Sequence, residues 1–82
     1  MDQIEKLRND INNLDNQIME LLNERFHKSI LVGNRKKISK IDVLDSKREN
    51  EIINKSLNYD HSTQIGRIYS LIMKESKLLQ RK

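Results

Sequence analysis

The chain has 82 residues, of which 34% are charged and only 4% aromatic, and it contains no Pro, Cys or Trp. This length allows one small domain with a thin core, which we expect to span residues 1–82, and the lack of Cys excludes disulfides and thiolate metal sites. The formal charge of +4 does not indicate a nucleic-acid partner, because Lys and Arg are scattered and the three aromatic residues do not alternate with a basic patch.

The first predicted element is one long helix from Ile4 to Lys37. Its apolar residues recur at alternating spacings of three and four, as in a helix that buries one stripe: Ile4, Leu7, Ile11, Leu14, Ile18 and Leu21. At 1.5 Å per residue such a helix is roughly 50 Å long, which exceeds the size of a compact small domain. Because an exposed apolar stripe of that length is an association surface, we expect a homodimer in which two such helices cover each other.

The stripe changes character in the second half of this helix. The next positions in the spacing are Arg25 and Lys28, so cations stand where the pattern calls for apolar residues. Lys36 lies eleven residues after Arg25, about three helical turns, and therefore shares its face. Burying Arg25 without an anion is costly. The position indicates a buried ion pair, a helix that leaves the core at this point, or a pocket for a small anion.

Arg8 lies beside the apolar seam near the start of the same helix. Its simplest interpretation is a surface residue whose stem covers Leu7. It is seventeen residues from Arg25, or roughly 25 Å along one helix, so the two cannot hold one small ligand from the same chain. In an antiparallel pair of long helices, however, Arg8 of one subunit could approach Arg25 of the other and form two composite pockets.

The periodicity fails between Ile38 and Asp45, which predicts a loop, and a second helix is expected to follow as far as about Leu57. Asp45 and Ser46 are candidate N-caps, and Ser46 with Glu49 has the spacing of a capping box. Glu49 could instead present its carboxylate to the pocket. The apolar residues that this helix should bury are Ile52, Ile53 and Leu57.

A polar connection, residues 58–63, precedes a third predicted helix that ends near Gln80, with Ser62 or Thr63 as its cap. Its buried stripe starts with Ile65, Ile68, Tyr69 and Ile72 and continues with Ser76, Leu79 and Gln80. Ser76 and Gln80 are four residues apart and lie on the same side of the helix. This polar end indicates either fraying at the C-terminus or another wall of the pocket.

The sequence provides no metal-ligand cluster and no membrane anchor. The two histidines, His27 and His61, are too isolated to indicate a metal centre. The N-terminus has no apolar leader, and no apolar run has the length of a membrane span. We therefore expect a cytoplasmic protein without a membrane partner.

Several short segments, none of them specific alone, form a joint pattern over nearly the whole chain. They are Leu7-Arg8, Leu14-Asp15, Leu21-Leu22-Asn23-Glu24-Arg25, Val32-Gly33-Asn34-Arg35-Lys36, Asp45, Arg48-Glu49, and Ile72-Met73-Lys74-Glu75-Ser76 through Gln80. Together they resemble the all-helical, type II chorismate mutase family in its stand-alone, single-domain form. One departure is the loop, where family members often have Pro near the position of Asp42.

The resemblance implies an all-α fold with one long, one short and one medium helix per chain, intertwined with a second copy as a homodimer. It implies an isomerase that catalyses the Claisen rearrangement of chorismate to prephenate, in the shikimate-pathway branch leading to phenylalanine and tyrosine. No cofactor is implied. The protein would select a folded substrate conformer and stabilise the charge that develops as the ether bond breaks.

The resemblance also implies roles for individual residues. Arg25 and Arg8 of the partner subunit match the carboxylate binders, assisted by Ser76. Lys36 and Gln80 match the pair that contacts the ether oxygen. The implied catalytic residues are Lys36, Gln80, Arg25 and Glu49. The implied substrate-binding residues are Arg8, Arg25, Lys36, Asp45, Arg48, Glu49, Ser76 and Gln80.

The remaining implied roles concern the second helix and the loop before it. Glu49, with the turn at Asp45, would hold the ring hydroxyl of the substrate, and Glu49 could also orient Lys36. Arg48 matches a further pocket position that supplies electrostatic support.

Two alternative functions remain open at this stage. An isochorismate-pyruvate lyase shares the fold and the substrate chemistry, although the Arg48-Glu49 pair and the loop length favour the mutase. A non-enzymatic coiled-coil dimer is the other alternative, because the seam from Ile4 to Leu21 is long enough to support one. That alternative predicts that Arg25→Leu would be tolerated.

Overall fold

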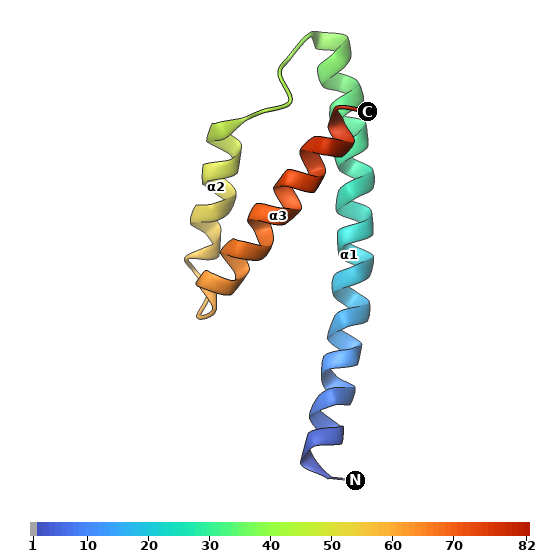
Figure 1. The fold of residues 1–82 in the computed structure, drawn as a ribbon, viewed down its shortest axis with the longest axis vertical. Helices are drawn as coiled ribbons and strands as arrows, with labels where there is room; N and C mark the ends of the chain where they lie inside the picture. Colours follow the sequence, from blue (N-terminus) through green and yellow to red (C-terminus); the bar gives the residue numbers. More distant parts are fainter. Residues whose placement is uncertain (1) are drawn as a thin grey trace.

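The structure is a computed structural model that describes residues 2–82, and within them it contains three helices and no strands (Figure 1). Helix α1 runs over Gln3–Ser39, α2 over Ser46–Ser56 and α3 over Ser62–Gln80. The predicted all-α class is confirmed, as are the long, the short and the medium helix. Their bounds differ from the predicted ones by only one or two residues.

Local signals fix both ends of α1. The Asp2 carboxylate accepts a hydrogen bond from the Glu5 backbone N–H at 2.9 Å and so caps the first turn. At the other end, Lys40 adopts the left-handed conformation, with φ of 55°, and the Ile41 N–H donates to the Lys36 carbonyl oxygen at 2.8 Å. This is a Schellman-type stop with Lys in the position that Gly usually occupies. It turns the chain sharply into the loop that leads to α2.

Of the two candidate N-caps of α2, Asp45 is confirmed, and the capping box of Ser46 with Glu49 is wrong. Ser46 is the first helical residue, and the cap is the Asp45 carboxylate, which accepts a hydrogen bond from the Arg48 backbone N–H at 3.0 Å. Because Asp45 is the cap, the residue three positions later is Arg48, so Glu49 does not occupy the reciprocal position of a capping box. Its side chain pairs instead with Lys77 of α3.

The predicted cap of α3 is also wrong. His61, rather than Ser62 or Thr63, occupies the N-cap position, and its side chain makes no capping hydrogen bond. The first turn is closed through the backbone alone, where the Ile65 N–H donates to the His61 carbonyl oxygen at 3.0 Å. Helix α3 therefore begins without the side-chain signal on which the prediction relied.

Helix α3 crosses between the other two helices and packs against both, whereas α1 and α2 have no close backbone contact with each other (Figure 1). The buried apolar residues in the described part of the chain are Ile72 and Met73 of α3. Leu57 and Ile68, which were predicted to be buried, are 69% and 58% exposed because no part of residues 2–82 covers them. The core of the single chain is therefore thin, as expected for this length.

The N-terminal half of α1 projects beyond the rest of the fold (Figure 1). The radius of gyration is 16.1 Å, whereas a compact chain of this length would have about 12 Å. Along the projecting half, Ile4, Ile11 and Ile18 of the predicted stripe are 61%, 52% and 52% exposed. A periodic apolar stripe with this exposure has the properties of an association surface.

Gly33 lies where α1 and α3 approach too closely for any larger residue. A Cβ atom at this position would be 2.6 Å from both the Cα and the carbonyl oxygen of Gln80. These are backbone atoms of α3 and cannot rotate away. The glycine therefore allows the end of α3 to pack directly on α1, although glycine costs about 1 kcal/mol in a helix relative to Ala.

We expect Gly33→Ala to lower the free energy of unfolding by about 1–3 kcal/mol, because the clash outweighs the gain in helix propensity. Urea denaturation followed by circular dichroism measures the change. Gly66→Ala is the matched control on α3, since a Cβ there would meet the Ser56 Oγ atom at an ordinary 3.6 Å. A Gly33→Ala variant that gained stability as the control does would contradict the close contact.

Candidate active site

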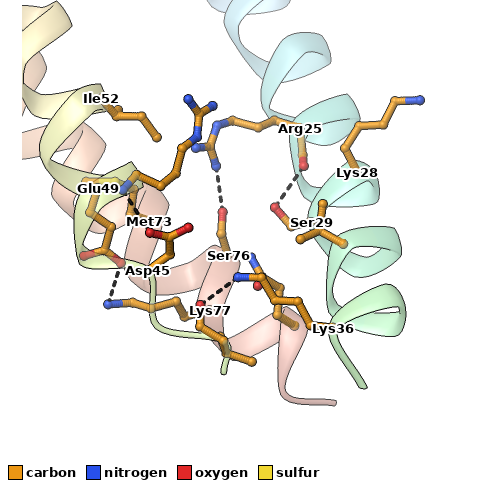
Figure 2. A pocket seen from close by; sticks show the side chains of 14 residues that line it. Arg25, Lys28, Ser29, Lys36, Asp45, Glu49, Ile52, Met73, Ser76 and Lys77 are labelled. Carbon is orange, nitrogen blue, oxygen red and sulfur yellow. Dashed lines mark hydrogen bonds and ion pairs between the residues drawn. The ribbon is translucent and has the colours of Figure 1, made fainter. Parts of the chain in front are cut away.

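A cavity of about 410 Å³ opens between α1, the loop, α2 and α3 (Figure 2). Of the eight residues predicted to bind substrate, seven line it: Arg25, Lys36, Asp45, Arg48, Glu49, Ser76 and Gln80. Arg8 does not line it and belongs to the exposed, projecting half of α1. The chain thus brings together all the predicted site residues except the one expected to come from a second subunit.

Arg25 of α1 points across the cavity toward α3 and is held on two sides (Figure 2). Its Nη1 donates to the Ser76 Oγ atom at 2.7 Å, and its guanidinium carbon lies 5.9 Å from the centre of the Tyr69 ring. Within residues 2–82 it forms no ion pair with a carboxylate. The guanidinium is therefore fixed in place, with N–H groups available for an anion in the cavity.

Lys36 is half-buried near the end of α1, and its Nζ donates to the Val43 carbonyl oxygen in the loop at 2.9 Å. Since an ammonium group has three N–H donors, this bond holds the side chain at the cavity wall and leaves donors for a ligand. Glu49 was expected to orient Lys36, but in the structure the two side chains have different partners. The Glu49 Oε2 atom lies 3.0 Å from the Lys77 Nζ instead, because Lys77 projects from α3 toward α2.

The two other predicted residues, at and just after the N-cap of α2, differ in how firmly they are held. Asp45 is committed to its capping bond, which fixes its carboxylate at the edge of the cavity. The Arg48 side chain is 60% exposed and lies 4.0 Å from the Glu51 carboxylate. An exposed pair of this kind contributes little energy, so the Arg48 guanidinium is free to turn toward a ligand.

The polar end of α3 is a wall of the cavity and not a frayed terminus, since the helix continues to Gln80. Ser76 is only 5% exposed. The amide oxygen of Gln80 is buried and has no hydrogen-bond partner among residues 2–82. A buried acceptor without a donor is unfavourable. Turning the amide by about 180° would place its NH₂ group, a donor, at the same position.

The cavity wall carries five cationic side chains and two acidic ones. The cations are Arg25, Lys28, Lys36, Arg48 and Lys77, and the acids are Asp45 and Glu49. Such an excess of positive charge in a partly enclosed space concentrates small anions. The described residues contain no group of three or more His, Asp or Glu side chains that could hold a metal ion, and we assign no metal ligands.

The predicted site omitted three polar residues of the cavity wall, namely Lys28, Ser29 and Lys77. Ser29 is one helical turn after Arg25, and its Oγ donates to the Arg25 carbonyl oxygen at 3.0 Å. The i to i+4 spacing on a face already marked as unusual was the available signal. Lys77 had no such signal, because its role depends on where α2 lies relative to α3.

The fold and the cavity define a class, namely an all-helical protein that gathers cations and a neutral amide around a space for a small anion. The chain belongs to the chorismate mutase type II family, whose sequence model matches residues 7–81. The match begins just before Arg8 and ends just after Gln80, so it includes every predicted site residue. A comparison with curated proteins found no match. No helix in the described part of the chain is long and apolar enough to cross a membrane.

Proposed function

We propose that the protein catalyses the Claisen rearrangement of chorismate to prephenate, a step toward phenylalanine and tyrosine. The observation that carries the proposal is the convergence of Arg25, Lys36 and Gln80 on one cavity in a chain of this family. Chorismate carries two carboxylates, and a planar guanidinium binds a carboxylate through two parallel hydrogen bonds. The rearrangement is unimolecular, so the side chains need only select a conformer and stabilise charge.

In this proposal the ether oxygen of the substrate lies between Lys36 and Gln80. Negative charge builds on that oxygen as the bond breaks, and prearranged donors stabilise it without having to reorganise. The ammonium supplies a charge, and the amide supplies a neutral N–H donor. Glu49 and Asp45 receive the ring hydroxyl, while Arg48 provides further positive potential.

The protein acts as a homodimer in this proposal, with Arg8 of the partner subunit completing each cavity. The uncovered stripe on the projecting half of α1 supports a second copy as the covering surface. An antiparallel arrangement would carry Arg8 toward the other subunit's Arg25. That arrangement would complete the set of carboxylate binders.

The direct test is to incubate the purified protein with chorismate and, separately, with isochorismate. Formation of prephenate from chorismate supports the proposal, whereas release of salicylate and pyruvate from isochorismate assigns the related lyase activity instead. A size measurement on the same sample by light scattering should give twice the mass of the 9.8 kDa chain. An inactive dimer would favour the non-enzymatic coiled-coil alternative.

Complementation tests whether Arg8 acts across the dimer. Arg8→Ala and Arg25→Leu variants should each be nearly inactive. Co-expression of the two should recover about one quarter of wild-type activity, since half of randomly assembled dimers are mixed and each mixed dimer has one intact cavity of two. If Arg8 acted within its own chain, no mixed dimer would contain an intact cavity, and activity would stay at the level of the parent variants.

A further inference from the structure

Lys77 lines the cavity but has no role in the proposed reaction, and its side chain forms an ion pair with Glu49. Glu49 projects from α2 and Lys77 from α3, and their side chains meet at the cavity wall (Figure 2). Their Nζ and Oε2 atoms are 3.0 Å apart, and the two side chains are only 24% and 28% exposed. This separates the pair from Arg48 and Glu51, which lie 4.0 Å apart on one helix with 60% and 53% exposure.

We infer that Lys77 is a positioning residue, which holds the Glu49 carboxylate on the α2 side of the cavity and neutralises its charge. The inference rests on the proposed function and deepens it. Lys77 is not proposed to touch the reacting atoms. By balancing the charge of Glu49, Lys77 allows this carboxylate to line a cavity that binds a substrate with two negative charges.

The charges around Glu49 explain why such a residue is needed. A bare carboxylate in the cavity would repel an incoming dianion, and the repulsion is strong where water is partly excluded. It would also attract Lys36 and Arg48, whose donors the substrate requires. With Lys77 as the partner of Glu49, Lys36 stays bonded to the Val43 carbonyl oxygen and remains available.

The competing explanation is that the ion pair only ties α2 to α3. The two explanations differ when the charges are removed separately. If the ion pair only links the two helices, Lys77→Met and Glu49→Gln each break it completely. Combining the two substitutions should then leave KM no different from that of Lys77→Met. A neutralising role predicts that Lys77→Met leaves a repelling charge behind, which the second substitution removes.

The experiment compares kcat and KM for chorismate in Lys77→Met, Glu49→Gln, the double variant and Lys77→Arg. Lys74→Met is the matched control, because Lys74 is exposed on the same helix and does not line the cavity. Circular dichroism and light scattering establish that each variant is folded and associated. Lys77→Gln serves as a second neutral variant if Lys77→Met does not fold.

We expect Lys77→Met to raise KM about tenfold with a smaller change in kcat, and Lys77→Arg to stay within about threefold of wild type. Adding Glu49→Gln to Lys77→Met should bring KM back down at least about threefold while kcat remains low, because the repelling charge is gone. Lys74→Met should change neither constant appreciably.

Three outcomes overturn the inference. The first is a Lys77→Met variant with the constants of the Lys74→Met control. The second is a double variant whose KM is no lower than that of Lys77→Met. The third is failure of both neutral Lys77 variants to fold, which would make the pair a structural tie. An inactive wild-type protein would instead overturn the proposed function, and the inference with it.

Discussion

An Arg25→Leu variant should fold and associate like the wild-type protein but lose about 10³-fold in kcat/KM for chorismate. The guanidinium is the best-fixed cation of the cavity, since it is bonded to Ser76 and lies over Tyr69. Leu keeps the apolar contacts of the stem but binds no carboxylate. Stability should change by no more than about 1 kcal/mol, because the main loss is the hydrogen bond to Ser76.

Steady-state kinetics and urea denaturation of the same preparation check both parts of this expectation. Arg67→Leu is the matched control, because Arg67 is exposed on α3 and does not line the cavity. It removes the same charge and should leave kcat/KM within about twofold. Full activity in Arg25→Leu would contradict the role assigned to Arg25.

A Gln80→Glu variant should lose about 10²–10³-fold in kcat at neutral pH and recover as the pH falls. The wild-type amide cannot ionise, so its N–H donor is present at every pH. The introduced carboxyl donates a hydrogen bond only when protonated, and as a carboxylate it repels the negative charge developing on the ether oxygen. The unperturbed pKa of a glutamic acid is about 4.3, so recovery should grow about tenfold for each unit as the pH falls toward that value.

The pH dependence of kcat, measured from about pH 5 to pH 8, decides this prediction. The wild-type profile should be flat over this range, and circular dichroism at each pH controls for acid unfolding. A flat profile for Gln80→Glu would show that Gln80 does not donate to the reacting oxygen. The close backbone contact with Gly33 should keep the introduced carboxyl in place.

Much of the fold could be predicted because helix periodicity is local information. The stripe from Ile4 to Leu21, its interruption at Arg25 and the polar end of α3 at Ser76 and Gln80 are all visible in the spacing of residues. These same interruptions identified cavity residues, because burying a cation or an amide on an apolar face costs free energy unless the group has a partner. The contribution of Arg8 across a dimer stays a prediction.

The features that sequence reasoning missed depend on how the helices lie relative to one another. The sequence of a single helix does not reveal that Glu49 of α2 pairs with Lys77 of α3, or that Lys36 of α1 reaches the Val43 carbonyl oxygen in the loop. The need for glycine at Gly33 comes from the backbone of α3, forty-seven residues further along the chain. The Asp45 cap was predicted, but the capping box at Ser46 and the cap of α3 were not correct, because several neighbouring polar residues could each have served.

Helix α3 is the element that packs against both outer walls of the cavity, α1 and α2. Because α1 and α2 have no close backbone contact, only α3 and the connecting loop set how far apart the two outer walls stand. A substitution that forces α3 away from α1 or α2 therefore changes the spacing between the walls even when it alters no side chain that meets the substrate. Gly33 of α1 is such a position, because a Cβ there would push against the α3 backbone, whereas a Cβ at Gly66 of α3 would meet Ser56 of α2 only at an ordinary contact distance.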